Sequence, residues 1–255
     1  MSKRVVYVQY GMKRSGNHAV SSMLQPALGA HQFNNTVPMG PVFAGTAEVP
    51  QLDDFGTWFF SPDASRVPGM CIDDWPRLQR IYASFEDLPL GLGAVRNQNP
   101  VNILVIRSFE NLMSSRIGKG MLKPHPAYPT TMDGTMSRII ETWKQHAGTY
   151  LRRDDTDRIA ILFDTWVADP GYRREIGRRL EVEIEDETLN AISRFGGGSS
   201  FDGLDYDGRA SEMAVSRRAL LLGPKERALL ERTTADEEIQ ELNAEVKASD
   251  PAGLI

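Results

Sequence analysis

The feature that most constrains this chain is a glycine-containing turn close to its N-terminus. Residues 5–10 form an apolar, β-branched run that predicts a short buried strand, and residues 19–28 carry apolar side chains at helical spacing. Gly11 and Gly16 lie between these two segments. In a strand, glycine turn and helix start, backbone N–H groups and the helix N-terminus converge on an anion. The turn is therefore predicted to bind phosphate.

The same turn departs from the phosphate-binding loop of the nucleoside triphosphatases. Gly11 and Gly16 match the G-x-x-x-x-G frame, but Asn17 and His18 stand where that loop has Lys and Ser/Thr. In that loop the Lys reaches the β- and γ-phosphates and the hydroxyl holds Mg²⁺. The sequence therefore favours a nucleotide bound without magnesium over ATP or GTP. A tight turn between strand and helix with no ligand is the structural alternative.

The segment Lys-Arg-Ser-Gly-Asn-His at 13–18 resembles the 5′-phosphosulfate loop of sulfotransferases that use 3′-phosphoadenosine-5′-phosphosulfate (PAPS). That family typically has Pro-Lys-Ser-Gly-Thr-Thr, or an Arg-Ser-Gly variant, between its first strand and helix. The resemblance implies that Arg14 and the backbone amides of 15–17 neutralise charge on the departing 5′-phosphate. The residues that it assigns to this end of the nucleotide are Lys13, Arg14, Ser15, Gly16, Asn17 and His18.

A second buried strand is predicted at residues 100–107, and it ends in Arg107. Ser115 follows two turns into the next predicted helix, so that it faces the same point as Arg107. The sulfotransferase family has a strand followed by Arg-Asp-Pro-Arg-Asp-x-x-x-Ser, whose Arg and Ser bind the 3′-phosphate. The resemblance implies the same role for Arg107 and Ser115, although Ser108 and Phe109 replace the Asp-Pro. A surface salt bridge is the alternative for Arg107.

Two carboxylates follow a third predicted strand at residues 80–85. Glu86 and Asp87 are well placed for proton chemistry, because ligands of open parallel sheets bind at the carboxyl ends of the strands. The segment resembles the family's Thr-His-Leu-Pro-Leu, which aligns Asp87 with the catalytic His and places Glu86 beside it. His18 is a reserve candidate for the base or for a donor to the bridging oxygen. A solvated acidic loop is the alternative for the carboxylates.

The C-terminal half carries the remaining cofactor candidates. A strand is predicted at 158–163, and the segment after it is similar to the family's Tyr-Glu-Asp-Met-x-x-Asp-Pro, whose Tyr lies against adenine. The resemblance therefore implies an adenine contact from Phe163 or Trp166, with core packing as the alternative. In the family a basic C-terminal stretch covers the 3′-phosphate. The candidates here are Arg209, Arg217 and Arg218, and a solvated helix face is the alternative.

These segments predict one α/β domain over residues 1–255, of the P-loop type, with three α/β/α layers and a central parallel sheet of about five strands. Irregular segments at about 29–72, 117–135 and 196–210 are predicted to be lids or acceptor loops. A long amphipathic helix is expected at 132–153. Further helices are expected at 171–180 and, rich in charged residues, at 220–248, the last broken at 223–224.

Composition narrows the possible partners. The net charge of −5 argues against a general nucleic-acid or anionic-membrane surface. Cys71 is the only cysteine, which excludes an intrachain disulfide and a cysteine-cluster metal site. The first predicted strand begins at Val5, which leaves no room for a signal peptide, and no apolar run is long enough for a membrane span. We therefore expect a cytoplasmic protein whose anion site is local.

The sequence as a whole predicts transfer of a sulfuryl group from PAPS to an acceptor hydroxyl or amine. The product nucleotide is adenosine 3′,5′-bisphosphate (PAP), and no metal is required. Saccharides, lipids, phenols and peptide hydroxyls remain open as acceptors, and the sequence carries no signal for the oligomeric state. The alternatives are a P-loop kinase of a small molecule, which requires Mg·ATP, and a non-catalytic nucleotide-binding module.

Overall fold

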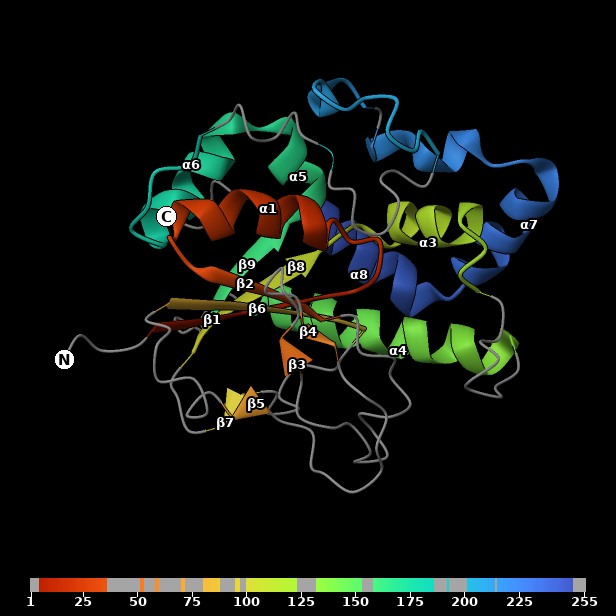
Figure 1. Cartoon of the computed structure of the whole chain (residues 1–255). Helices are drawn as coiled ribbons and strands as arrows, with labels where there is room; N and C mark the ends of the chain where they lie inside the picture. Colours follow the sequence, from red (N-terminus) through yellow and green to blue (C-terminus); the bar gives the residue numbers. More distant parts are fainter. Residues whose placement is uncertain are drawn as a thin grey trace.

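The computed structural model describes residues 5–35, 51–52, 58–59, 70–71, 80–87, 95–96, 100–122, 132–152, 158–185, 192, 201–213 and 215–249. Its centre is a five-stranded sheet in which every neighbouring pair is parallel (Figure 1). In spatial order the strands are β2 (His31–Asn35), β6 (Arg80–Glu86), β1 (Val5–Gly11), β8 (Val101–Ile106) and β9 (Arg158–Leu162).

The strand order creates a topological switch point beside β1. From β1 the chain continues to β2 and β6 on one side, and it then crosses to β8 and β9 on the other side. Gly11 at the end of β1 is aligned with Glu86 of β6 and with Val105 of β8. In open α/β sheets ligands bind at such a point, outside the carboxyl ends of the strands. The predicted phosphate loop and Arg107 both lie at this edge.

Helices cover both faces of the sheet, which confirms the predicted α/β architecture (Figure 1). One face packs against α1 (Asn17–Ala27), α5 (Phe163–Ala168) and α6 (Pro170–Arg179), with a core that includes Leu24 and Trp166. The core of the other face is centred on Trp143. It is shared by α3 (Phe109–Gly118), α4 (Met132–Leu151), α7 (Pro224–Thr233) and α8 (Glu237–Ala248).

Strand β2 lies inside the segment that the sequence predicts to be a loop at 29–72. It pairs with β6 as an edge strand of the main sheet. The segment 31–35 contains one apolar residue, and an edge strand does not need the continuous apolar run by which buried strands are recognised. Four two-residue strands form two small separate pairs: β3 (Gln51–Leu52) with β4 (Trp58–Phe59), and β5 (Met70–Cys71) with β7 (Val95–Arg96).

The C-terminal helices are divided differently from the sequence prediction. Residues 215–221 form a 3₁₀ helix, η5 (Val215–Leu221), which follows the short η4 (Ala210–Glu212). The break at 223–224 marks the start of α7, where Glu226 accepts a hydrogen bond from Gly223 N at 2.9 Å. A second break separates α7 from α8. Asp236 caps the start of α8 by accepting a hydrogen bond from Ile239 N at 3.0 Å. None of the described helices is long and apolar enough to cross a membrane.

The hydroxyl of Tyr172 offers a test of how β9 is held against α6. It accepts a hydrogen bond from Leu162 N at 3.0 Å and donates to Ala160 O at 3.3 Å. Tyr172→Phe leaves the Leu162 N–H without this buried acceptor, so we expect a loss of about 1–3 kcal/mol in the free energy of unfolding. Urea unfolding should show a lower midpoint with an unchanged slope. An unchanged midpoint would contradict this role for the hydroxyl.

Candidate functional site

The loop between β1 and α1 has the backbone of an anion-binding turn. Ser15 N donates to Met12 O at 2.9 Å, and Arg14 and Gly16 adopt left-handed conformations with φ of 73° and 96°. Gly16 is the N-cap of α1, which has no side-chain cap and no acidic residue in its first turn. The first N–H groups of a helix lack intrahelical partners and carry partial positive charge. This end of α1 is therefore suited to bind an anion.

Asn17 holds the loop from inside. Its Nδ2 donates to Met12 O at 3.1 Å and to Glu86 Oε1 at 3.0 Å, and its Oδ1 accepts from Ser15 Oγ at 3.2 Å. A Cβ on Gly11 would lie 1.9 Å from Asn17 Oδ1, so only glycine allows this close approach. The side chains of Ser15 and Asn17, both predicted to bind the nucleotide, therefore point into the fold. They shape the loop, and the helix end offers its backbone to a ligand.

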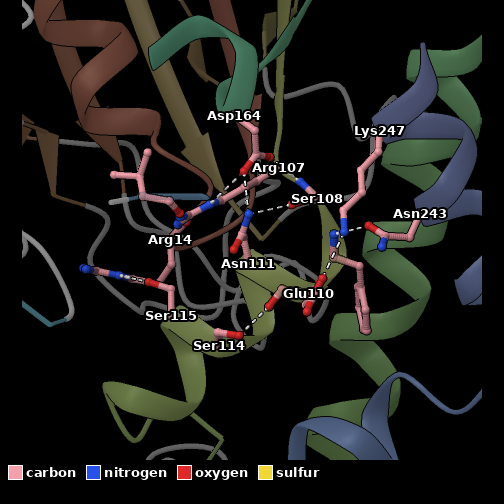
Figure 2. Close-up of polar contacts among 12 residues, drawn as sticks. Arg14, Arg107, Ser108, Glu110, Asn111, Ser114, Ser115, Asp164, Asn243 and Lys247 are labelled. Carbon is pink, nitrogen blue, oxygen red and sulfur yellow. Dashed lines mark hydrogen bonds and ion pairs between the residues drawn. The ribbon is translucent and has the colours of Figure 1, made fainter. Parts of the chain in front are cut away.

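Arg107 joins the second predicted anion site to the loop. Its Nη1 donates to Arg14 O at 3.1 Å, and its Nη2 donates to Val215 O of η5. Arg14 in turn donates from Nε to Ser115 Oγ at 3.4 Å. Figure 2 shows Arg107 between Arg14 and Asp164, with Ser115 on α3 beside the Arg14 side chain. The structure thus brings Arg14, Arg107 and Ser115 together, as the sequence predicts.

The guanidinium groups at this edge are buried at an electrostatic cost. Burial lowers the pKa of Arg107 to about 10, and the charges of Arg218 and Arg14 act in the same direction while Asp164 opposes them. Burial also lowers the pKa of Arg14, assisted by Arg218 and Arg116 and opposed by Glu86. In the described part of the chain, Arg107 Nε and Arg116 Nε are buried without a hydrogen-bond partner. A bound anion would relieve the repulsion and satisfy such donors.

The two carboxylates at the end of β6 have different surroundings. Glu86 accepts from Asn17, and its Oε1 lies 3.9 Å from His18 Nε2. The His18 side chain is 30% exposed, whereas that of Glu86 is 8% exposed. Asp87 accepts from Lys13 N at 3.0 Å and forms a buried salt bridge with Arg116. Glu86 therefore lies near a second group that can accept a proton, the His18 imidazole, whereas Asp87 is paired with a cation.

Phe163 packs against Gly16 of the loop and against Arg107, and it is 7% exposed. A Cβ on Gly16 would come within 2.2 Å of its ring, and the Arg107 guanidinium carbon lies over the ring at 5.5 Å from the centroid. Such a contact between a cation and an aromatic face is attractive. The structure thus shows Phe163 supporting the loop and Arg107. Trp166, the other predicted adenine contact, is fully buried in the core.

Asp164 is a site residue that the sequence analysis did not select. It accepts from Ser108 N at 2.7 Å and from Asn111 Nδ2 at 2.8 Å, and its Oδ1 lies 3.9 Å from Arg107 Nε (Figure 2). It therefore places a negative charge beside Arg107 and accepts a backbone hydrogen bond at the start of α3. Its position just after β9 was the available signal, because side chains after neighbouring parallel strands meet at one edge.

Of the C-terminal cations predicted for the site, Arg218 is buried and its charge acts on this cluster. Its side chain is 4% exposed and pairs with Asp202 at 2.6 Å, and its charge affects both Arg107 and Arg14. The predicted Arg209 is instead 59% exposed and pairs with Glu212 on η4 at 3.4 Å. The described residues contain no group of three or more His, Cys, Asp and Glu side chains placed to hold a metal ion.

Comparison with known proteins identifies the kind of fold. No protein-family model matches the chain, and no curated protein sequence matches it. Among solved structures, the chain is similar to the mouse sulfotransferase SULT7A1, whose crystal structure is a complex with PAP. The similarity has a TM-score of 0.51 at 11% sequence identity, and it covers 97% of this chain and 88% of that chain. The chain therefore has an α/β fold of the kind seen in a sulfotransferase.

Gly16→Ala tests the packing of the phosphate loop on Phe163. The new methyl group would overlap the ring, and the left-handed φ of 96° adds backbone strain. We expect a loss of about 2–5 kcal/mol in the free energy of unfolding. Gly29→Ala is the matched control, since Gly29 also has a left-handed φ of 57° but has open space around its Cβ position.

The control should lose only about 1–2 kcal/mol, the cost of the left-handed conformation alone. Both variants are compared by denaturant unfolding in the absence of nucleotide. Equal losses in the two variants would show that Phe163 does not press on the loop.

Proposed function

We propose that this chain is a sulfotransferase that transfers a sulfuryl group from PAPS to a hydroxyl or amine of an acceptor and leaves PAP. The observation that carries the proposal is the contact of Arg107 with the loop, from Nη1 to Arg14 O at 3.1 Å. It places two basic sites, one after β1 and one after β8, side by side at the switch point. A nucleotide with phosphates at both its 3′ and 5′ positions presents two anions in this way.

The 5′ end of the nucleotide is assigned to the N-terminus of α1, with Lys13, Arg14 and the residues through His18 around it. The helix end and the Arg14 guanidinium supply positive charge where the 5′-phosphate departs. Preorganised charge of this kind is usually the largest catalytic contribution, and the loss of one donor costs on the order of 10²–10³ in rate.

The 3′-phosphate is assigned to Arg107 and Ser115. Because Arg107 Nη2 already donates to Val215 O, the phosphate would take over this donor from η5. Arg218 of η5 is the additional cation that the burial and charge pattern supports best, ahead of the exposed Arg209. The Phe163 ring packs against the Arg107 guanidinium, and this contact is compatible with a role in nucleotide binding.

The acceptor proton is assigned to Glu86 and His18. As the acceptor oxygen or nitrogen bonds to sulfur, the bond from sulfur to the 5′-phosphate oxygen breaks and a proton must leave the acceptor. Glu86 Oε1 lies 3.9 Å from His18 Nε2, and His18 is the more exposed of the two. Asp87, the other carboxylate predicted from sequence, is committed to Arg116 and to Lys13 N. General base catalysis of this type contributes about 10²–10⁴ in rate.

Nucleotide-dependent stability separates the proposed function from its rivals. We expect PAP to raise the melting temperature of the protein, since a ligand at about 100 times its Kd adds roughly 2.7 kcal/mol of stability. Arg107→Ala should abolish the shift, because it removes the buried cation of the 3′ site. Lys247→Ala is the matched control. It breaks an exposed salt bridge to Glu110 on α3, at 2.9 Å, and should keep the full shift.

The pattern across nucleotides decides between the rivals. A shift with Mg·ATP and none with PAP would indicate the kinase. Binding of PAP without sulfuryl transfer from PAPS to any acceptor in an extract would indicate the non-catalytic module. Normal PAP binding by Arg107→Ala would remove Arg107 from the 3′ site.

Turnover and binding should separate at the proposed base. Glu86→Gln is expected to retain PAP affinity within about threefold, and both Glu86→Gln and His18→Asn are expected to lose roughly 10²–10⁴ in kcat. Transfer of ³⁵S-labelled sulfate from PAPS gives kcat, and calorimetry gives the PAP affinity. Normal kcat in both variants would place the base elsewhere.

A further inference from the structure

Asp87 and Arg116 form a buried pair that the proposed chemistry does not use. The relative exposures of these residues are 9% for Asp87 and 3% for Arg116. We propose that they are positioning residues, which hold the phosphate loop between the end of β6 and helix α3. The inference rests on the proposed function for its catalytic consequence, whereas the holding of the loop can be measured without any ligand.

Asp87 attaches the end of β6 to the last residue of β1 and to the loop that follows it. Its own N–H donates to Gly11 O at 2.9 Å, and its carboxylate accepts from Lys13 N at 3.0 Å. Asp87 adopts a left-handed conformation with φ of 59°, which is uncommon for a residue other than glycine. Strain of this kind persists only where the surrounding contacts impose it. The conformation of Asp87 is therefore set by its attachment to the loop.

Arg116 connects this carboxylate to α3. Its Nη2 forms a salt bridge with Asp87 Oδ1, the same oxygen that accepts from Lys13 N. The preceding residue, Ser115, accepts from Arg14 Nε at 3.4 Å. Two consecutive residues of α3 thus hold two consecutive residues of the loop. Lys13 is held through Asp87, and Arg14 is held directly.

The Asp87–Arg116 pair lies beside the part of the loop whose geometry the proposed chemistry depends on. Arg14 has a left-handed φ of 73°, and its guanidinium must be aimed at the departing phosphate. A displacement of about 1 Å at such a group costs on the order of 10²-fold in rate. Breaking only one half of a buried pair leaves an unpaired charge, so each single change is expected to release the loop.

Neutral substitutions test the pair directly. Asp87→Asn and Arg116→Gln each remove one charge, and the double variant removes both, so that no unpaired charge stays buried. Hydrogen exchange of the backbone amides at 12–16 reports the holding of the loop in the free protein. Calorimetry gives the affinity for PAP, and sulfate transfer gives kcat and KM.

We expect each single variant to exchange faster at 12–16 and to bind PAP about tenfold more weakly, and the double variant to lose no more than the worse single variant, because the two residues act as one unit. Arg116→Lys, which keeps the charge, should lie between the wild type and Arg116→Gln. Lys247→Ala breaks the exposed salt bridge between α8 and Glu110 of α3, the helix that carries Arg116. This control is expected to match the wild type in all three measurements.

Losses in the double variant that equal the sum of the two single losses would overturn the proposal, because additive losses mean that the two residues act independently. So would Asp87→Asn with unchanged exchange and PAP affinity but a lost kcat, because that result would make Asp87 the catalytic base. If the wild-type protein does not bind PAP, the proposed function fails. The exchange measurements then still decide whether Asp87 and Arg116 hold the loop.

Discussion

The site depends on a buried guanidinium that bridges two strand ends. Arg107 leaves β8 and donates to the carbonyl of Arg14 in the loop that follows β1. Burying a charge is costly unless it is paired and hydrogen bonded. Here two carbonyl oxygens, the carboxylate of Asp164 and the face of Phe163 share that task. Trp143 Nε1 also donates to the carbonyl of Arg107 at 2.9 Å, which ties the strand end to α4.

The same contacts decide which helix end is available to an anion. At the start of α3, Asp164 accepts from Ser108 N and Asn243 of α8 accepts from Phe109 N at 2.7 Å (Figure 2). Side chains from two other elements therefore already satisfy this helix end. The start of α1 has no side-chain cap, and the loop before it carries Arg14, whose carbonyl accepts from Arg107. The polarity of the site follows, with the departing phosphate assigned to α1 and the second phosphate to the Arg107 side.

The local sequence predicted the strands that end at the site, the glycine-containing loop, and the placement of Arg107 and Ser115. Apolar runs located β1, β6, β8 and β9 to within a residue or so, and the glycines at 11 and 16 located the loop. The spacing of Arg107 and Ser115 placed both on the loop side of the sheet, since a strand end and the helix after it have nearly standard geometry. Edge strand β2 was missed, because its segment carries no apolar periodicity.

The sequence by itself determined the α/β architecture and the pairing of a basic loop with a basic strand end, because strand and helix periodicity and turn chemistry act over a few residues. Only the tertiary structure decided how neighbouring residues divide their roles. It turned Glu86 toward His18 and Asp87 toward Arg116, and it brought in Asp164. The physical reason is range: the Arg107 contact with Arg14 spans 93 residues, and that of Arg14 with Ser115 spans 101. Such contacts form only when the sheet aligns its strand ends.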